Sequence, residues 1–384
     1  MISSANKKEA GPAGSKIRVM VVDDSIVIRG LISRWLSALP DIEVVASCRN
    51  GQEAVDTVAK CRADVAILDI EMPVMDGLTA LPAMLKAAPG VKVLMASTLT
   101  RRNAGISIQA LQKGATDYVP KPESMRGGHA SGDFQNELIE KVRVLGLKRM
   151  RETGRKPVAV SAGVTAAVRE SAPSLLSPAG PLSYQAASRV PPRIVAIGSS
   201  TGGPKALFEL FKGLSPALDR VPTVITQHMP PTFTSILAEH ITSVAKRPCV
   251  EGETGMVLQP GKIYIAPGGF HMLLEQKGSD VVIKLSDSAP VNFCRPAVDP
   301  MLDSLIPIYG AAILVCILTG MGHDGRDGSK HVQAKGGTIL AQDEASSVVW
   351  GMPGAVATAG ICHKVLPLDR LPAAMTALIK GGAA

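Results

Sequence analysis

Aromatic residues are scarce in this chain of 384 residues: they make up 3% of it, whereas hydrophobic residues make up 46%. The cores must therefore be built from aliphatic side chains, and aliphatic strands that alternate with helices are typical of α/β packing. The formal net charge is +8, and many of the basic residues gather between Lys141 and Lys156. No aromatic ring interleaves with this basic cluster, as a single-strand nucleic-acid binder would need. A solvated linker is favoured over a site for nucleic acid or an acidic partner.

Long apolar runs and paired cysteines are also missing. No run approaches the length of a membrane span, and the first residues lack the apolar core of a signal peptide. The six cysteines form no C-x-x-C pair, which is typical of small buried residues in a reducing compartment. We therefore expect a cytoplasmic protein without membrane insertion.

The first part of the chain alternates between strand and helix patterns. Five apolar segments predict strands, at 17–22, 42–47, 65–68, 91–95 and 116–119. Helices are expected between them, including 26–39 and 52–60. This alternation predicts a five-stranded parallel doubly wound sheet.

Polar residues follow these strands at the edge where such sheets carry function. Asp23 and Asp24 end the first strand, and Asp69 ends the third. Three converging carboxylates call for a hard divalent ion, and Mg²⁺ suits a few oxygens and waters. Ser97 and Lys121 end the fourth and fifth strands, where they can contact a phosphoryl group.

This region resembles the receiver domain of two-component response regulators. The segments that carry the resemblance are 21–25 (VVDDS), 68–77 (LDIEMPVMDG), 95–98 (MAST) and 118–122 (YVPKP). The resemblance implies that Asp69 accepts a phosphoryl group and that Asp23 and Asp24 hold Mg²⁺ together with it. It further implies a switch formed by Ser97, Tyr118 and Lys121. Pro120 is a departure that gives no reason to doubt the site.

A second conspicuous stretch lies at 193–204, where Gly198-Ser199-Ser200-Thr201-Gly202 fits G-x-S-x-G. The residues before it predict a buried strand and those after it a helix. A serine on such a turn projects its hydroxyl from the sheet edge, next to the N–H groups of a helix start. Ser200 is therefore a candidate nucleophile. The alternative is a turn that binds phosphate or only connects two elements.

Two further strand ends supply partners for Ser200. The strand 223–226 leads to His228, a suitable proton acceptor at neutral pH, and the strand 311–318 leads to a glycine-rich loop that contains Asp324. Strands are also expected at 262–266, 281–285 and 338–341, and the strand 281–285 is expected to form a hairpin with its neighbour. Helices are expected at 301–306 and 371–379. The rival candidates are His271 and His323 as the base and Asp327 as the acid. Dinucleotide binding fails because G-x-G-x-x-G is absent.

The second region resembles the catalytic domain of the chemotaxis protein-glutamate methylesterases, the CheB family. The segments that carry the resemblance are 197–204 (IGSSTGGP), 227–230 (QHMP), 264–268 (YIAPG), 318–325 (LTGMGHDG) and 341–344 (AQDE). It implies catalysis by Ser200, His228 and Asp324, with the backbone N–H of Met321 in the oxyanion hole. Many relatives have Asn at position 323 and Ser or Thr at position 297, where this chain has His and Ala.

Together the patterns predict two α/β domains: a receiver and a hydrolytic domain with a mostly parallel sheet and a β-hairpin. The expected segments are a disordered tail (1–15), the receiver (16–145), a flexible linker (146–192) and the methylesterase domain (193–384). The family implies demethylation and deamidation of chemoreceptors, activated by a chemotaxis histidine kinase with Mg²⁺ on the receiver and no cofactor for catalysis. A regulator whose second half only binds a partner would show a degraded triad, and a DNA-binding regulator would need a helix-turn-helix.

Overall fold

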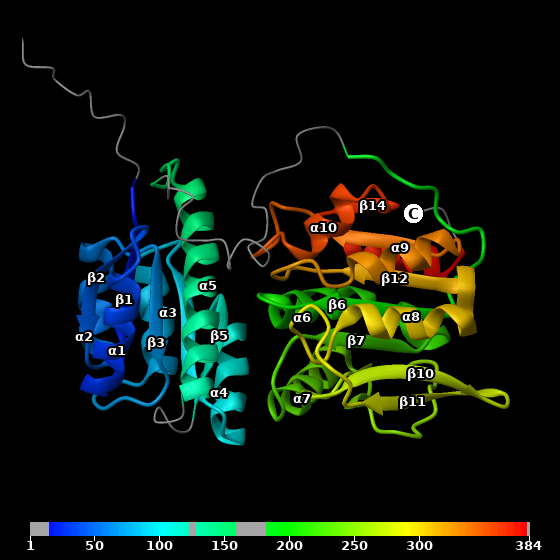
Figure 1. The fold of residues 1–384 in the computed structure, drawn as a ribbon, viewed down its shortest axis with the longest axis horizontal. Helices are drawn as coiled ribbons and strands as arrows, with labels where there is room; N and C mark the ends of the chain where they lie inside the picture. Colours follow the sequence, from blue (N-terminus) through cyan, green and yellow to red (C-terminus); the bar gives the residue numbers. More distant parts are fainter. Residues whose placement is uncertain (1–14, 123–127, 159–181, 382–384) are drawn as a thin grey trace, which may run out of the picture. The chain divides into compact units, whose positions relative to one another are not determined.

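The computed structural model describes residues 15–122, 128–158 and 182–381 (Figure 1). The predicted disordered tail falls almost wholly outside the described residues, and so does the central part of the predicted linker, at 159–181. None of the helices in the described ranges is both long and apolar enough to cross a membrane.

The receiver region contains one parallel sheet of five strands in the order β2-β1-β3-β4-β5, as the sequence predicts. Its strands are β1 (Ile17–Val22), β2 (Ile42–Cys48), β3 (Val65–Asp69), β4 (Lys92–Thr98) and β5 (Asp117–Lys121). Its helices are α1 (Ile26–Ser37), α2 (Gly51–Cys61), α3 (Gly77–Ala87), α4 (Arg101–Gln112) and α5 (Gly128–Glu152). Helices α1 and α5 contact each other, as do α2 and α3.

Short polar side chains begin four of these helices. Ser25, Asn50, Asp76 and Thr100 each accept a hydrogen bond from a backbone N–H in the first turn of α1, α2, α3 and α4. Such a cap satisfies one of the backbone donors that a helix leaves unpaired at its start. Helices α1, α2 and α4 begin within a few residues of the preceding strand, whereas a longer loop separates α3 from Asp69 at the end of β3.

The second region contains a parallel sheet of seven strands in the order β14-β13-β12-β6-β7-β9-β8, and a separate antiparallel hairpin of β10 and β11. The strands are β6 (Ile194–Ser199), β7 (Thr223–Gln227), β8 (Cys249–Glu251), β9 (Ile263–Ile265), β10 (His271–Lys277), β11 (Asp280–Ser286), β12 (Ile313–Ile317), β13 (Thr338–Gln342) and β14 (Lys364–Leu366). The predicted fold class, with its mostly parallel sheet and hairpin, is confirmed.

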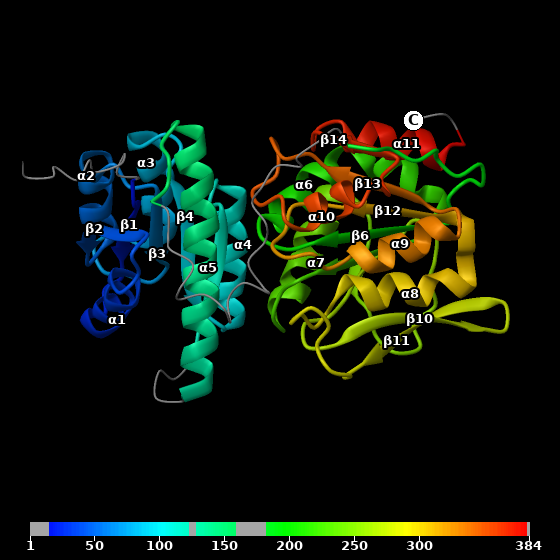
Figure 2. The same ribbon diagram turned by 45° about the horizontal axis from the view of Figure 1, so that its top comes forward.

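Helices cover both faces of this sheet (Figure 2). They are α6 (Gly203–Leu214), α7 (Phe233–Ala245), α8 (Val298–Tyr309), α9 (Arg326–Ala334), α10 (Met352–Thr358) and α11 (Leu371–Ile379), with short 3₁₀ helices at Ser215–Arg220 and Gly310–Ala312. Helix α6 contacts α7 and α11, whereas α9 contacts α8 and α10. The core between the sheet and the second group is aliphatic and includes Val298, Leu302, Val315 and Ile339, as the scarcity of aromatic residues requires.

The end of the predicted linker is hydrogen-bonded to this second region. The backbone N–H of Gln185 donates to Cys362 O at 2.8 Å, and that of Ser188 donates to Thr338 Oγ1 at 2.9 Å. Residues from 185 onward are therefore tied to the edge of the seven-stranded sheet, beside β13 and β14.

Candidate functional site

Ser200 occupies the turn between β6 and α6, and it is partly exposed. Its backbone N–H donates to Thr319 O at 3.0 Å, and its carbonyl accepts from Gly203 N at 2.7 Å. Gly202 has a φ of +76°, and a Cβ there would lie 2.6 Å from the side chain of Val348. Only glycine fits that position, because the backbone is left-handed and the neighbouring side chain is close. The turn is thus fixed on both sides of the serine.

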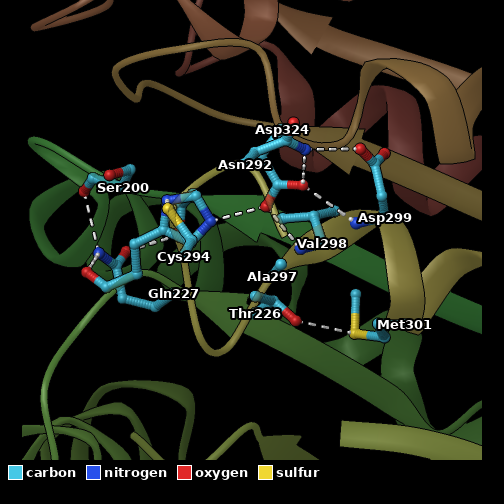
Figure 3. Close-up of polar contacts among 12 residues, drawn as sticks. Ser200, Thr226, Gln227, Asn292, Cys294, Ala297, Val298, Asp299, Met301 and Asp324 are labelled. Carbon is cyan, nitrogen blue, oxygen red and sulfur yellow. Dashed lines mark hydrogen bonds and ion pairs between the residues drawn. The ribbon is translucent and has the colours of Figure 1, made fainter. Parts of the chain in front are cut away.

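His228 follows β7, the strand next to β6, and its backbone N–H donates to Ser199 O at 3.0 Å. Gln227 joins the two strand ends more firmly. Its Oε1 accepts from Ser199 Oγ at 2.7 Å, and its Nε2 donates to the carbonyl oxygens of Ser200 at 3.0 Å and His228 at 3.1 Å. The serine turn and the histidine are therefore held in one hydrogen-bonded unit (Figure 3).

Asp324 contacts the far nitrogen of this histidine. His228 Nε2 lies 2.7 Å from Asp324 Oδ2, and the carboxylate is buried. The backbone N–H of Val298 donates to the same oxygen at 2.6 Å, while Asn292 Nδ2 donates to Oδ1 at 3.0 Å. Burial alone would raise the pKa of Asp324, but the bonds from His228, Val298 and Asn292 outweigh it and lower this pKa to about 2. Asp324 is thus charged, and it orients the ring so that Nδ1 is the nitrogen available for proton transfer.

The other nitrogen of His228 contacts a thiol. Cys294 Sγ lies 3.3 Å from Nδ1, whereas Ser200 Oγ makes no hydrogen bond to His228 among the described residues. Burial by itself lowers the pKa of His228, but the negative charges of an ionised Cys294 and of Asp324, with their hydrogen bonds, outweigh burial and raise this pKa. The structure therefore joins His228 and Asp324 directly and places Ser200 on the adjacent strand end. Catalytic serines commonly tighten their bond to the base only in the substrate complex.

Two backbone N–H groups near Ser200 fit an oxyanion hole. Those of Thr201 and Met321 donate no hydrogen bond within the part of the chain described. A Cβ at Gly320 would lie 2.9 Å from Ser200 Cβ, so the loop that carries Met321 passes directly beside the serine. Thr201 was not a sequence candidate, although the residue after a nucleophile commonly supplies one donor.

The rival candidates have other partners. Both ring nitrogens of His271 contact backbone groups, since Nε2 lies 3.1 Å from Ala289 O and Nδ1 accepts from Ala297 N at 3.1 Å. Asp327 forms ion pairs with Arg326 and Lys330 on α9. The side chain of His323 is exposed, and among the described residues it forms no hydrogen bond to His228 or Asp324. None of the three competes with the pair of His228 and Asp324.

The acidic residues of the receiver meet at the ends of β1 and β3. One carboxylate oxygen from each of Asp23, Asp24 and Asp69 lies within 4.8 Å of the others. Asp23 and Asp69 are buried, Asp24 is exposed, and such oxygens are the ligands that Mg²⁺ prefers. The three positions therefore fit a hard divalent cation.

The predicted switch residues lie on the two strands at the β5 end of the sheet. Ser97 lies within β4, directly after the residue that pairs with Asp69, and its hydroxyl is 2.8 Å from that of Ser107. Tyr118 and Lys121 lie within β5, and both are buried.

Comparisons with known proteins agree with this architecture. Residues 19–130 match the response regulator receiver domain, and residues 195–375 match the CheB methylesterase. The chain is 51% identical over 99% of its length to the "Protein-glutamate methylesterase/protein-glutamine glutaminase of group 2 operon" of Bradyrhizobium diazoefficiens, of which the match covers 97%. It is 52% identical over 94% of its length to the "Protein-glutamate methylesterase/protein-glutamine glutaminase 1" of Paramagnetospirillum magneticum, of which 95% is covered.

The chain belongs to the CheB methylesterase family. The solved structure of the Thermotoga maritima CheB methylesterase catalytic domain is 42% identical and has a TM-score of 0.48, with 49% of this chain and 100% of that chain covered. The two curated relatives and the matches to the two family models show that the chain is a hydrolase of the CheB family, joined to a response regulator receiver domain.

Three contributors to this CheB site escaped sequence reasoning: Cys294, Asn292 and Asp299. Asn292 Nδ2 donates both to Asp324 and to Asp299 Oδ2, at 2.9 Å from the latter. Burial and the charge of Asp324 raise the pKa of Asp299 to about 6. Asn292 and Cys294 lie in an irregular loop, so neither strand nor helix periodicity marks them.

Proposed function

We propose that this chain hydrolyses the methyl esters of glutamate residues on chemoreceptors and that Ser200 is its nucleophile. Both of the relatives named above are called protein-glutamate methylesterase/protein-glutamine glutaminase. The observation that carries the proposal is the buried contact of 2.7 Å between His228 and Asp324, next to the serine turn. A charged carboxylate on one ring nitrogen leaves the opposite nitrogen as a base towards the serine side.

The reaction follows from these positions. Ser200 Oγ attacks the ester carbonyl while its proton moves to Nδ1 of His228, and Asp324 stabilises the resulting imidazolium. The N–H groups of Met321 and Thr201 donate hydrogen bonds to the carbonyl oxygen as it gains negative charge. His228 then gives the proton to departing methanol, and water hydrolyses the acyl-enzyme by the same route.

The same site serves for deamidation of receptor glutamines. An amide carbonyl forms the same acyl-enzyme, with ammonia leaving in place of methanol. We expect the two activities to share Ser200, His228 and Asp324, so variants at these positions lose both.

We propose that the receiver controls ester hydrolysis. A chemotaxis histidine kinase supplies the phosphoryl group to Asp69. Asp23, Asp24 and Asp69 would hold Mg²⁺, which would supply positive charge to neutralise the phosphoryl group. Ser97, Tyr118 and Lys121 then respond to the phosphoryl group, which shifts the population towards the active form. We place the reaction in the cytoplasm, as the sequence predicts.

The deciding experiment measures methanol release from methylated receptor membranes, with Mg²⁺ and a small phosphodonor. Ser200→Ala should lower the rate on the order of 10⁴-fold or more. Ser279→Ala is the matched control, because this serine is exposed in the turn between β10 and β11 and should leave the rate intact. Release by Ser200→Ala at the wild-type rate would move the nucleophile elsewhere. If wild type released no methanol, the chain would either bind a partner without catalysis or act on a different ester.

A further inference from the structure

Cys294 differs from the other five cysteines in its surroundings. Four of the six are buried, and only Cys61 and Cys294 are partly exposed. Burial raises the thiol pKa at each of the five others, namely Cys48, Cys61, Cys249, Cys316 and Cys362. A raised thiol pKa keeps the sulfur protonated and therefore unreactive at neutral pH.

Cys294 is the first member of a row of three groups. Its Sγ lies 3.3 Å from Nδ1 of His228, and Nε2 of the same ring lies 2.7 Å from Asp324 Oδ2. Transfer of the thiol proton to Nδ1 gives a thiolate beside an imidazolium whose other side faces a buried carboxylate. Such a partner is the arrangement that makes a thiol nucleophilic.

The backbone around Cys294 fixes the sulfur in this place. Cys294 N donates to Val291 O at 2.9 Å and Val291 N donates to Cys294 O at 3.1 Å, which closes a tight turn. The two residues between them, Asn292 and Phe293, have φ angles of 51° and 63°. Left-handed backbone at a phenylalanine is unfavourable and persists only where its surroundings enforce it. Here the side chain of Asn292 anchors the turn to Asp324.

The hydrogen bonds of the described residues show where the charged neighbours of the pair lie. The carboxylate of Asp324 faces His228 from the loop after β12, and Asp299 on α8 approaches Asp324 through Asn292. The guanidinium of Arg295 donates instead to the carbonyls of Asp287 and Ser288, at 2.7 and 3.0 Å. Within the described ranges, His228 is therefore the titratable group that contacts the sulfur.

We propose that Cys294 is a modification site within the catalytic centre, at which thiol-directed electrophiles or peroxides switch off ester hydrolysis. This inference rests on the proposed role of His228 as the catalytic base. A group attached to Sγ would fill the space beside Nδ1 and take away the nitrogen that must accept the proton of Ser200.

Iodoacetamide and hydrogen peroxide would modify the sulfur by two different reactions. With iodoacetamide, the thiolate forms a C–S bond and displaces iodide, while Nδ1 keeps the thiol proton. With hydrogen peroxide, sulfur attacks one oxygen and the O–O bond breaks, which gives sulfenic acid and water. The sulfur loses two electrons, the peroxide gains them, and a dithiol reductant reverses the step.

The test treats the full chain with iodoacetamide at several pH values and locates the adduct by peptide mass spectrometry. At pH 7 we expect Cys294 to react at least about tenfold faster than Cys61, because its proton has an acceptor. Its rate should change little towards pH 9, whereas that of Cys61 should rise steeply. Methanol release, relative to each variant's own untreated sample, should fall in parallel with the adduct at Cys294.

Three variants separate the possible explanations. Cys294→Ser should make methanol release insensitive to iodoacetamide and to peroxide, whereas Cys61→Ser should remain as sensitive as wild type. His228→Gln should slow labelling of Cys294 at pH 7 at least about tenfold, since the proton acceptor is gone. A dithiol should restore the peroxide-treated wild type.

The inference is overturned if Cys294 and Cys61 react at equal rates with equal pH dependence. It is also overturned if a full adduct at Cys294 leaves methanol release unchanged. Labelling of Cys294 is measured by mass spectrometry and needs no ester hydrolysis. Its rate can therefore be measured whether or not Ser200 is the nucleophile. A fully active Ser200→Ala would refute the proposed nucleophile and would leave the labelling rates to decide on the reactive thiol.

Discussion

At the scale of single residues, one amide nitrogen holds two buried carboxylates together. Asn292 Nδ2 donates to Asp299 Oδ2 at 2.9 Å and to Asp324 Oδ1 at 3.0 Å. Two like charges so close would otherwise repel, and this repulsion together with burial raises the pKa of Asp299 to about 6. The amide stabilises the charged form of both groups and thereby the orientation of His228.

Asn292→Ala should therefore lower kcat while KM stays near its wild-type value. A hydrogen bond to a charged group contributes about 1.5–3 kcal/mol, which corresponds to roughly 10- to 100-fold in rate if it is fully felt in the transition state. Loss of the donor raises the pKa of both carboxyl groups, so the acid limb of the kcat/KM profile should move to higher pH. Steady-state methanol release between pH 5 and pH 9 measures both effects.

Asn136→Ala is the matched control, because this asparagine is exposed on α5. It should change neither kcat nor the acid limb. An unchanged pH profile in Asn292→Ala, with kcat at the wild-type level, would show that Asp324 keeps its position and charge without the amide.

The three residues predicted from the sequence to hydrolyse the ester all follow the ends of parallel strands. Ser200, His228 and Asp324 follow β6, β7 and β12, so the topology of a parallel sheet predicts their meeting. Asn292 and Cys294 come from a loop before α8 that no strand end marks. Their positions depend on a tight turn and on tertiary contacts, which have no periodic signature in the sequence.

At the scale of elements, apolar runs predicted most strands to within two residues. The strands expected at 17–22 and 223–226 are found as β1 and β7, at Ile17–Val22 and Thr223–Gln227. The sequence did not predict the short edge strands β8 and β14, of three residues each, nor the strand β10 (His271–Lys277), which pairs with β11 in the hairpin. The helix predicted at 301–306 extends over Val298–Tyr309, and its start at Val298 is the part that holds Asp324.

The loop between β3 and α3 depends on a glycine at its end. A Cβ at Gly77 would lie 2.0 Å from the backbone oxygen of Asp69, and the N–H of Gly77 donates to Ile70 O at 2.9 Å. Gly77→Ala should therefore displace the end of β3 and destabilise the receiver by roughly 1–3 kcal/mol. It should also slow phosphorylation of Asp69. Hydrogen exchange of peptides from residues 17–98 and labelling by a phosphodonor measure the two effects.

Gly30→Ala is the control for this prediction, since a Cβ at Gly30 in α1 meets no atom within 4 Å. Alanine favours a helix over glycine by roughly 1 kcal/mol, so this variant should slow hydrogen exchange or leave it unchanged. Equal exchange and equal phosphorylation in the two variants would mean that the β3–α3 loop adapts to the added methyl group.

At the scale of the whole molecule, one chain combines a receiver domain with a hydrolytic domain. Alternating strands and helices, and two sets of motifs, were enough to predict the two parallel sheets and the family. The proposed coupling concerns free energy: phosphorylation of Asp69 must change the population of the active hydrolase. A coupling of 1–3 kcal/mol, typical of two linked sites, corresponds to about 5- to 150-fold in activity.

Phosphorylation should therefore raise methanol release by wild type within that range, and the rise should need Mg²⁺. Asp69→Asn should abolish the stimulation, because an amide accepts no phosphoryl group. Removal of Mg²⁺ with EDTA should do the same to wild type, since the carboxylates of Asp23 and Asp24 would then repel the incoming phosphoryl group. Asp56→Asn, at an exposed position on α2 where the aspartate accepts a hydrogen bond from Gln52, should keep the full stimulation. Stimulation that persists in Asp69→Asn would mean that the phosphodonor acts at another residue. Stimulation that persists in EDTA would mean that activation does not require the metal.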